Sequence, residues 1–215
     1  GERFDDFLWR EILTPIGMTN VSLYGVRRES DELAEQSALG YNLHSGGVMF
    51  YEPGHNGPFW SVGAMGVSHQ DMTIWSRFHL NEGEVDGVRL MSKQTHCLMR
   101  QRIFDDRPNT ADLAHGFMEV VYNDHVFYGH GGSTIDFFTY WALIPELNVA
   151  VFISQNVGST YHLVHSLMPL LIDRLTGVTS KPYVVKHEEH NITTGNLVNL
   201  DEYTGRYFSN RNTFT

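Results

Sequence analysis

The sequence has few of the features that would tie it to a membrane, a disulfide framework or a nucleic acid. Its 215 residues include one cysteine, Cys97, which excludes a disulfide within the chain and a paired-cysteine metal motif. The longest apolar runs, at residues 141–144 and 149–153, are far shorter than the roughly 18 residues that a membrane-spanning helix needs. Residues 1–13 lack the apolar core of a signal peptide, and the sequence assigns no compartment. The net charge of −10 disfavours a protein that binds a phosphate backbone.

The composition is that of a folded chain, with 41% hydrophobic and 19% charged residues. Apolar residues recur at helical spacing over residues 4–14, where acidic residues at the start suit the helix dipole. A second helix is predicted over residues 68–80, with Ser68 as its cap and Asp71 three residues later, as in a capping box. A third is predicted over residues 92–102.

After Pro108 the hydrophobic period changes to two, which predicts strands. The predicted strands are residues 115–122, 126–129, 137–144 and 149–154. Short polar turns join them, so an antiparallel meander is expected, and a closing helix is predicted over residues 160–175. Helices followed by hairpin strands and a helix indicate an α+β fold. The glycine- and proline-rich residues 18–58 are predicted to be irregular, as the wall or lid of a site.

The chain is expected to divide into three parts. Residues 1–178 form the main domain, and residues 179–200, which are polar and without a sustained period, form a linker. Residues 201–215 begin with a strand-like segment and are expected to start a further β-domain.

The most informative segment is the stretch His130-Gly131-Gly132-Ser133, which stands between a predicted strand and a long aromatic strand. Two glycines after a strand remove side chains where another group approaches the backbone closely. A histidine beside them supplies a group that titrates near neutral pH. A glycine bulge with an incidental histidine explains these residues equally well.

This segment, with the aromatic strand, the PEL turn and the strand ending in Asn that follow, resembles the third motif region of the serine β-lactamase-like hydrolases. That group contains class C β-lactamases, penicillin-binding D,D-peptidases, D-aminopeptidases and family VIII esterases. Three other segments resemble the family in the same order, over residues 4–23 (a "PLGM" turn after a helix), 63–75 ("GGL-S-A-DMA-W") and 80–95 ("L-GG-DG-RLLS"). The resemblance covers roughly residues 4–176.

The resemblance implies a five-stranded antiparallel sheet flanked by helices and acyl transfer through a serine ester, with no cofactor and no metal. His130 stands where the third motif has Lys or His, and would bond to the carboxylate or carbonyl side of a substrate. Gly131 and Gly132 occupy the next two places and would bind substrate. The N–H of Ser133 would be one donor of the oxyanion hole. Histidine in the first place leans towards the esterase or peptidase-like members.

The sequence departs from the family because it contains neither S-x-x-K nor Y-x-N. The residues three places before Lys93, Lys181 and Lys186 are not serine, no asparagine follows a tyrosine by two places, and no G-x-S-x-G replaces them. The nucleophilic serine, its lysine and the tyrosine are therefore expected on a companion N-terminal segment or chain. Three of the five family strands are expected here, so the chain should not fold stably alone.

The chain is thus predicted to be part of a serine acyl hydrolase or acyltransferase that acts on an ester, amide or lactam. The alternative is a non-catalytic β-lactamase-like binding module. A metal site is a weaker hypothesis, because the pairs His162/His165 and His187/His190 lack a third ligand fixed by spacing. His125 is predicted to be a turn residue. Aromatic residues that would line a wall of the cleft, or simply pack in a loop, are Tyr41, Tyr51, Phe59 and Trp60.

Overall fold

The structure is a computed structural model that describes residues 1–23, 31–44, 47–51, 61–103, 112–123, 125–134, 136–158 and 162–177. The chain divides into two units, Gly1–Ser180 and Lys181–Thr215, and every described residue belongs to the first. The predicted linker and the predicted start of a β-domain lie outside the described residues.

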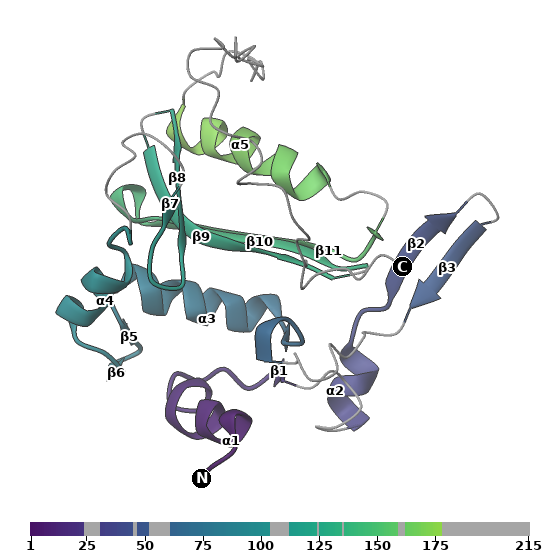
Figure 1. The fold of residues 1–215 in the computed structure, drawn as a ribbon, viewed down its shortest axis with the longest axis horizontal. Helices are drawn as coiled ribbons and strands as arrows, with labels where there is room; N and C mark the ends of the chain where they lie inside the picture. Colours follow the sequence, from purple (N-terminus) through teal and green to yellow (C-terminus); the bar gives the residue numbers. More distant parts are fainter. Residues whose placement is uncertain are drawn as a thin grey trace, which may run out of the picture. The chain divides into compact units, whose positions relative to one another are not determined.

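A five-stranded antiparallel sheet, in the order β11-β10-β9-β8-β7, forms the centre of the described unit (Figure 1). Its strands are β7 (Asp112–Leu113), β8 (Met118–Tyr122), β9 (His125–Ser133), β10 (Phe138–Ile144) and β11 (Val149–Gln155). All four predicted strands are present, but residues 114–117 form a turn closed by the Ala114 N–H and the Phe117 carbonyl at 2.8 Å, so β8 begins later than predicted. Three of the five family strands were expected in this chain, and the sheet of the described residues has five strands, one of them only two residues long.

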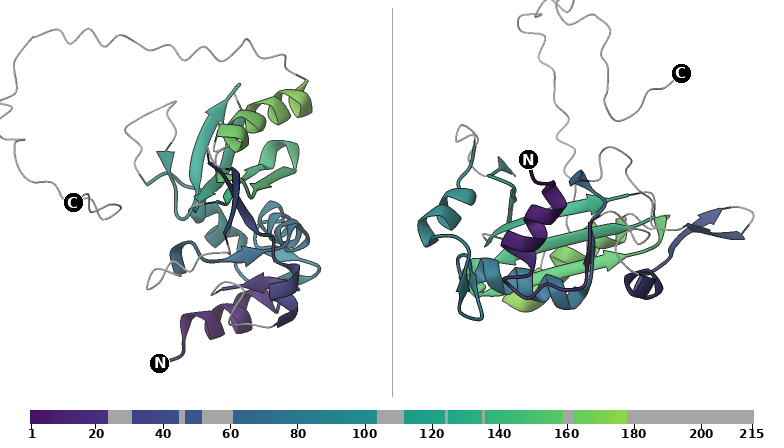
Figure 2. Two further views of the ribbon diagram at one scale, coloured as in Figure 1. Left: turned by 90° about the vertical axis from the view of Figure 1, so that its right-hand side faces the viewer. Right: turned by 90° about the horizontal axis from the view of Figure 1, so that it is seen from below.

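Helices cover both faces of the sheet, which confirms the α+β fold class (Figures 1 and 2). On one face α3 (His69–Leu80) and α4 (Lys93–Met99) contribute Trp75, Leu80 and Met99 to a core around Trp141 and Leu143 of β10. On the other face α5 (His162–Thr176) buries Met168 and Ile172 against β9 and β10. The short helix η3 (Pro145–Leu147) joins β10 to β11.

Helix α3 begins as predicted, because the Ser68 hydroxyl accepts the Asp71 N–H over 3.1 Å. The other half of the predicted capping box is wrong. The Asp71 carboxylate is 1% exposed and accepts the backbone N–H groups of Thr19 and Asn20 over 3.0 and 3.1 Å, besides the Ser68 hydroxyl at 2.7 Å. One buried carboxylate therefore joins the start of α3 to a turn about 50 residues earlier.

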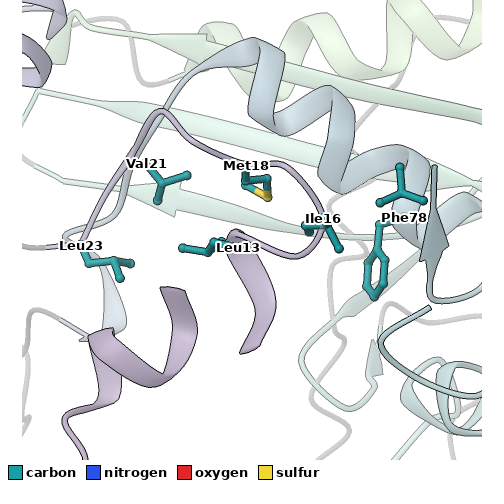
Figure 3. Packing of buried hydrophobic residues seen from close by; sticks show 7 residues of the cluster. Leu13, Ile16, Met18, Val21, Leu23 and Phe78 are labelled. Atoms are coloured by element: carbon teal, nitrogen blue, oxygen red, sulfur yellow. The ribbon is translucent and has the colours of Figure 1, made fainter. Parts of the chain in front are cut away.

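The predicted N-terminal helix is present as α1 (Phe4–Leu8) followed by a π-helical turn, η1 (Trp9–Leu13). After η1 the chain turns back along α3 and buries a cluster of apolar side chains beside it (Figure 3). The cluster contains Leu13, Ile16, Met18, Val21, Leu23, Phe78 and Val85.

The region that was predicted to be irregular contains regular elements. The described part holds β1 (Val21–Ser22), which pairs with β4 (Gly66–Val67), the helix α2 (Asp31–Gln36), and a hairpin of β2 (Gly40–His44) and β3 (Gly47–Tyr51). A turn at Asp86-Gly87 joins β5 (Glu84–Val85) to β6 (Val88–Arg89). Helix α4 ends at Met99, three residues earlier than predicted.

Candidate functional site

The four residues of the His-Gly-Gly-Ser segment form the last part of β9, where the sheet narrows. β9 pairs with β10 up to Ser133, opposite Phe138. On its other side β9 pairs with β8 only as far as Gly129, opposite Met118. Residues 130–133 therefore have a strand on one side, and no described strand pairs with them on the other. β9 lies inside the sheet by strand order, but the motif itself lies at an open edge.

The register shows which way the backbone of this segment faces. The Thr134 N–H donates to the Phe137 carbonyl over 2.9 Å, just beyond the last paired residues. Because hydrogen-bonded and non-hydrogen-bonded pairs alternate along an antiparallel ladder, every second position back from Thr134 bonds to β10. The intervening residues, Gly131 and Ser133, direct their N–H and C=O groups towards the open edge. The Ser133 N–H therefore faces the side on which a ligand backbone could add to the sheet.

The imidazole of His130 is exposed, and one of its hydrogen bonds sets its tautomer. His130 Nδ1 lies 2.5 Å from the carbonyl oxygen of Gly131. A carbonyl oxygen only accepts hydrogen bonds, so Nδ1 carries the proton that it donates. In the neutral ring Nε2 is then a hydrogen-bond acceptor, and in the protonated ring it is a second donor. The side chain can therefore take or give a proton at Nε2.

The two motif glycines have different surroundings. A Cβ atom added to Gly132 would lie 2.5 Å from the hydroxyl oxygen of Thr139 on β10, much closer than such atoms approach in proteins. A Cβ atom added to Gly131 would lie 3.6 Å from the nearest atom of the Tyr140 ring, an ordinary contact. A side chain at position 132 would therefore require the Thr139 hydroxyl to move. Thr139 is a site residue that sequence reasoning missed, because only the strand register places it beside Gly132.

The side chain next to His130 on the same face of the sheet is Trp141, its partner in the β9–β10 register. Trp141 is buried, and its indole N–H donates to the Ser76 hydroxyl of α3 over 2.8 Å. The turn after Ser133 lies against the hairpin strand β2, since a Cβ atom on Gly40 would lie 2.6 Å from that of Asp136. Elements from three separate parts of the sequence therefore surround the motif.

The other residues named from the sequence contribute less to this site. Tyr41 begins the docking of β2, where its N–H donates to the Asn156 carbonyl over 2.8 Å. His125 was predicted to be a turn residue, but it is the first residue of β9, at the opposite end from the motif, and it bonds to the Glu146 carboxylate. The side chain of Tyr51, and the whole of Phe59 and Trp60, lie outside the described residues.

A metal site finds no support in the described part of the chain. It contains no group of three or more His, Cys, Asp or Glu side chains arranged to hold an ion. The side chains of His162 and His165, and all of His187 and His190, lie outside that part. Among the described helices, none has both the length and the apolar character needed to cross a membrane.

The fold is an antiparallel sheet between two helical layers. The candidate site is a His-Gly-Gly-Ser segment at the open edge of one strand of that sheet. The family model described as Beta-lactamase matches residues 1–166. The chain therefore belongs to the beta-lactamase family, the family whose resemblance was stated from the motifs.

Known proteins similar to this chain include enzymes and penicillin-binding proteins. Penicillin-binding protein 4 of Amycolatopsis lactamdurans is 25% identical over 185 residues, which cover 83% of this chain and 48% of that protein. The octameric penicillin-binding protein homologue from Pyrococcus abyssi has a TM-score of 0.59 at 18% identity, over 78% of this chain and 37% of that one. A D-amino acid amidase from Ochrobactrum anthropi SV3 has a TM-score of 0.63 at 16% identity, over 84% and 55%. The chain thus spans about half or less of the length of these relatives.

Proposed function

We propose that this chain is the part of a serine acyl hydrolase or acyltransferase that carries the third catalytic motif. In this proposal an ester, amide or lactam is attacked by a serine outside the chain, and an acyl-enzyme forms. His130 bonds to the carboxylate or carbonyl side of the substrate through Nε2. The Ser133 N–H is one of two oxyanion donors, and Gly131 and Gly132 let the substrate backbone approach β9.

The single observation that carries the proposal is the open edge of β9 at residues 130–133. The Ser133 N–H faces this edge, and His130 stands exposed three positions before it. A preorganised backbone donor at this place is what acyl transfer needs, because charge develops on the carbonyl oxygen in the transition state. Loss of one such donor typically raises the barrier by about 3 to 4 kcal/mol.

The nucleophile is proposed to lie on a companion segment or chain, because the sequence contains no S-x-x-K. Two apolar surfaces support a companion. In the described residues no strand pairs with the outer edge of β11, although residues 149–153 of this edge strand are an unbroken apolar run that is half-buried throughout. Such runs are typical of strands inside a sheet. On α5 four leucines are 39–61% exposed: Leu163, Leu170, Leu171 and Leu175.

The proposal is tested by intact mass under denaturing conditions, before and after reaction with a fluorophosphonate probe for activated serines. We expect label on a second polypeptide, or on a polypeptide well above 24.6 kDa that contains this chain. In the labelled protein, His130→Ala should slow acylation markedly and leave the fold in place. His125→Ala, at the other end of the same strand, is the matched control and should label at the wild-type rate.

Two outcomes would contradict the proposal. Acylation of the His130→Ala variant at the wild-type rate would remove His130 from the site. A single unlabelled species at 24.6 kDa would favour the alternative, a non-catalytic binding module that keeps the open strand edge, which the absence of S-x-x-K and Y-x-N from this sequence also allows.

A further inference from the structure

Two histidines that the proposed function does not use form a buried pair between α3 and α4. His79 of α3 is 2% exposed, and His96 of α4 is 0% exposed. Nδ1 of His79 lies 2.9 Å from Nε2 of His96, so one ring donates its N–H to the other. This bond joins two helices that lie on the same face of the sheet as His130.

The surroundings of the pair keep both rings neutral. Burial, followed by the charges of His96 and Arg100, lowers the pKa of His79 to about 3. Burial and Arg100 also lower the pKa of His96, while the carboxylate of Glu82 acts in the opposite direction. Among the described residues, Arg100 and Glu82 are the charged side chains that act on the pair.

Burying the two histidines lowers the stability of the folded chain relative to an apolar core. A neutral imidazole has one N–H, and the shared bond uses one of the two present, so the two outer nitrogens are one donor and one acceptor. Neither His79 Nε2 nor His96 Nδ1 has a partner in the described part of the chain. An unpaired buried polar group typically costs on the order of 1–3 kcal/mol. Apolar side chains would fill this space at lower cost, so stability alone does not explain two histidines here.

The ring of His79 reaches the candidate site through Trp141. Their ring centroids are 5.5 Å apart, and the rings of Trp75 and Phe117 pack edge-on against His79 at 4.5 and 5.3 Å. Trp141 also bonds to the Ser76 hydroxyl, one helical turn before His79 on α3. Helix α3 therefore holds the indole at two points, by a ring contact and by a hydrogen bond.

Trp141 in turn stands beside His130. The two residues are directly opposite in the β9–β10 register, so their side chains share one face of the sheet with Cβ atoms about 5 Å apart. Trp141 is 9% exposed and His130 is exposed, so the two side chains differ in burial although they share one face of the sheet.

We propose that the His79–His96 hydrogen bond positions His130 for the proposed acyl transfer by fixing the His79 ring against Trp141. The inference rests on the proposed function for its catalytic consequence, but its structural part does not. Without the bond the His79 ring would be able to turn about its side-chain torsions, and the indole would follow. Both histidines are positioning residues in this scheme, since neither touches a substrate.

The test compares two variants of His96, the residue farther from Trp141, in the purified chain with any segment that accompanies it. In His96→Gln the side-chain amide retains a polar group that can bond to His79 Nδ1, and in His96→Leu it does not. The readout is the set of NMR chemical shifts of the His130 ring. We expect His96→Leu to move these chemical shifts, and His96→Gln to leave them close to the wild-type values. His69→Gln, an exposed histidine at the start of α3, is the control.

Acylation kinetics give the second readout. Misplacement of a reacting group affects the chemical step, so His96→Leu should lower the acylation rate constant about ten-fold while KM changes less than about two-fold. His79→Phe, which keeps a ring against Trp141 but cannot bond to His96, serves if His96→Leu does not fold. Wild-type chemical shifts of the His130 ring in the folded variant that lacks the bond overturn the inference, as do changed chemical shifts with an unchanged acylation rate. Failure of the wild-type protein to react with acylating probes overturns the proposed function instead, and the NMR comparison still tests the coupling of His96 to His130.

Discussion

Three glycines on β9 have very different neighbours, although they stand within four positions of one another. A Cβ atom on Gly129 would overlap the backbone oxygen of Trp141, which cannot move without distorting β10. A Cβ atom on Gly132 would meet the hydroxyl of Thr139, a side-chain atom that can rotate away. Gly131 has ordinary space beside Tyr140. Of the two motif glycines, Gly132 therefore has a close neighbour on β10, and Gly131 has room for a side chain at the open edge.

This difference predicts a graded response to alanine. Gly131→Ala should change the free energy of unfolding by less than about 1 kcal/mol, and Gly132→Ala should lower it by about 1–3 kcal/mol. Gly129→Ala should cost more than either. Thr139→Ala removes the atom that clashes, so the double variant Gly132→Ala/Thr139→Ala should recover most of the loss in a double-mutant cycle. Equal losses at positions 131 and 132 in denaturant titrations would show that Thr139 is not the cause.

At the scale of elements, one carboxylate organises the junction between the N-terminal turn and α3. Asp71 accepts three hydrogen bonds, two of them from the backbone of residues 19 and 20. Asp71→Asn places an amide N–H against donors and leaves at least one of them unpaired, so we expect a loss of about 2–3 kcal/mol in the free energy of unfolding. Asp86→Asn is the matched control, because the Asp86 side chain is 64% exposed in its pair with Arg77 and its loss should cost less than about 1 kcal/mol. Comparable losses in the two variants would contradict this role for Asp71.

Sequence patterns predicted the elements that are governed by neighbouring residues. The Ser68 cap and the apolar stripe of α3 are local, and the α3 boundaries agree with the prediction within one residue. The hairpin of β2 and β3 was missed because its position depends on the distant Asn156, whose carbonyl accepts the Tyr41 N–H. The two-residue strand β7 is too short to show a period of two.

The candidate site likewise has some features that the sequence predicted and others that depend on the fold. The motif residues and their likeness to the family were visible in the sequence, and so was the absence of S-x-x-K. That β9 loses its partner after Gly129 depends on where β8 begins, which the Ala114–Phe117 turn determines. The His79–His96 pair joins residues 17 positions apart on two helices, and no periodic pattern connects them.

The His79–His96 pair makes the free energy of unfolding depend on pH. The pKa of His79 is about 3 in the folded chain and near 6.5 when unfolded, so the unfolded state binds more protons between these values. Stability contributed by the neutral ring is present above pH 6.5 and is lost as the pH falls towards 3. We expect a loss of about 2 kcal/mol between pH 7 and pH 5 from His79 alone. Unfolding titrations should show a shallower slope for His79→Phe and an unchanged slope for His69→Gln; an unchanged slope for His79→Phe would contradict the assignment.

At the scale of the whole molecule, β11 and α5 carry apolar surfaces that no described element covers. An isolated exposed leucine needs no explanation, but four on one helix beside an apolar strand whose outer edge no described strand pairs with are unusual for a free surface. These observations support the companion segment of the proposed function, which would pair with β11 and pack on α5.

The companion is tested by a charge placed on α5. Leu170 is 61% exposed in this chain, so Leu170→Lys should be harmless to the chain itself and costly to any segment that buries it. Burying a leucine contributes about 1.5–3 kcal/mol, so the Kd of a separate companion should rise about ten-fold or more. If the companion belongs to the same polypeptide, a loss of similar size should appear in the free energy of unfolding. Leu98→Lys, at a leucine of α4 that is 49% exposed, is the control and should change neither quantity by more than about 0.5 kcal/mol. If Leu170→Lys behaves like Leu98→Lys in both measurements, α5 faces solvent, and the companion must be sought at the edge of β11 alone.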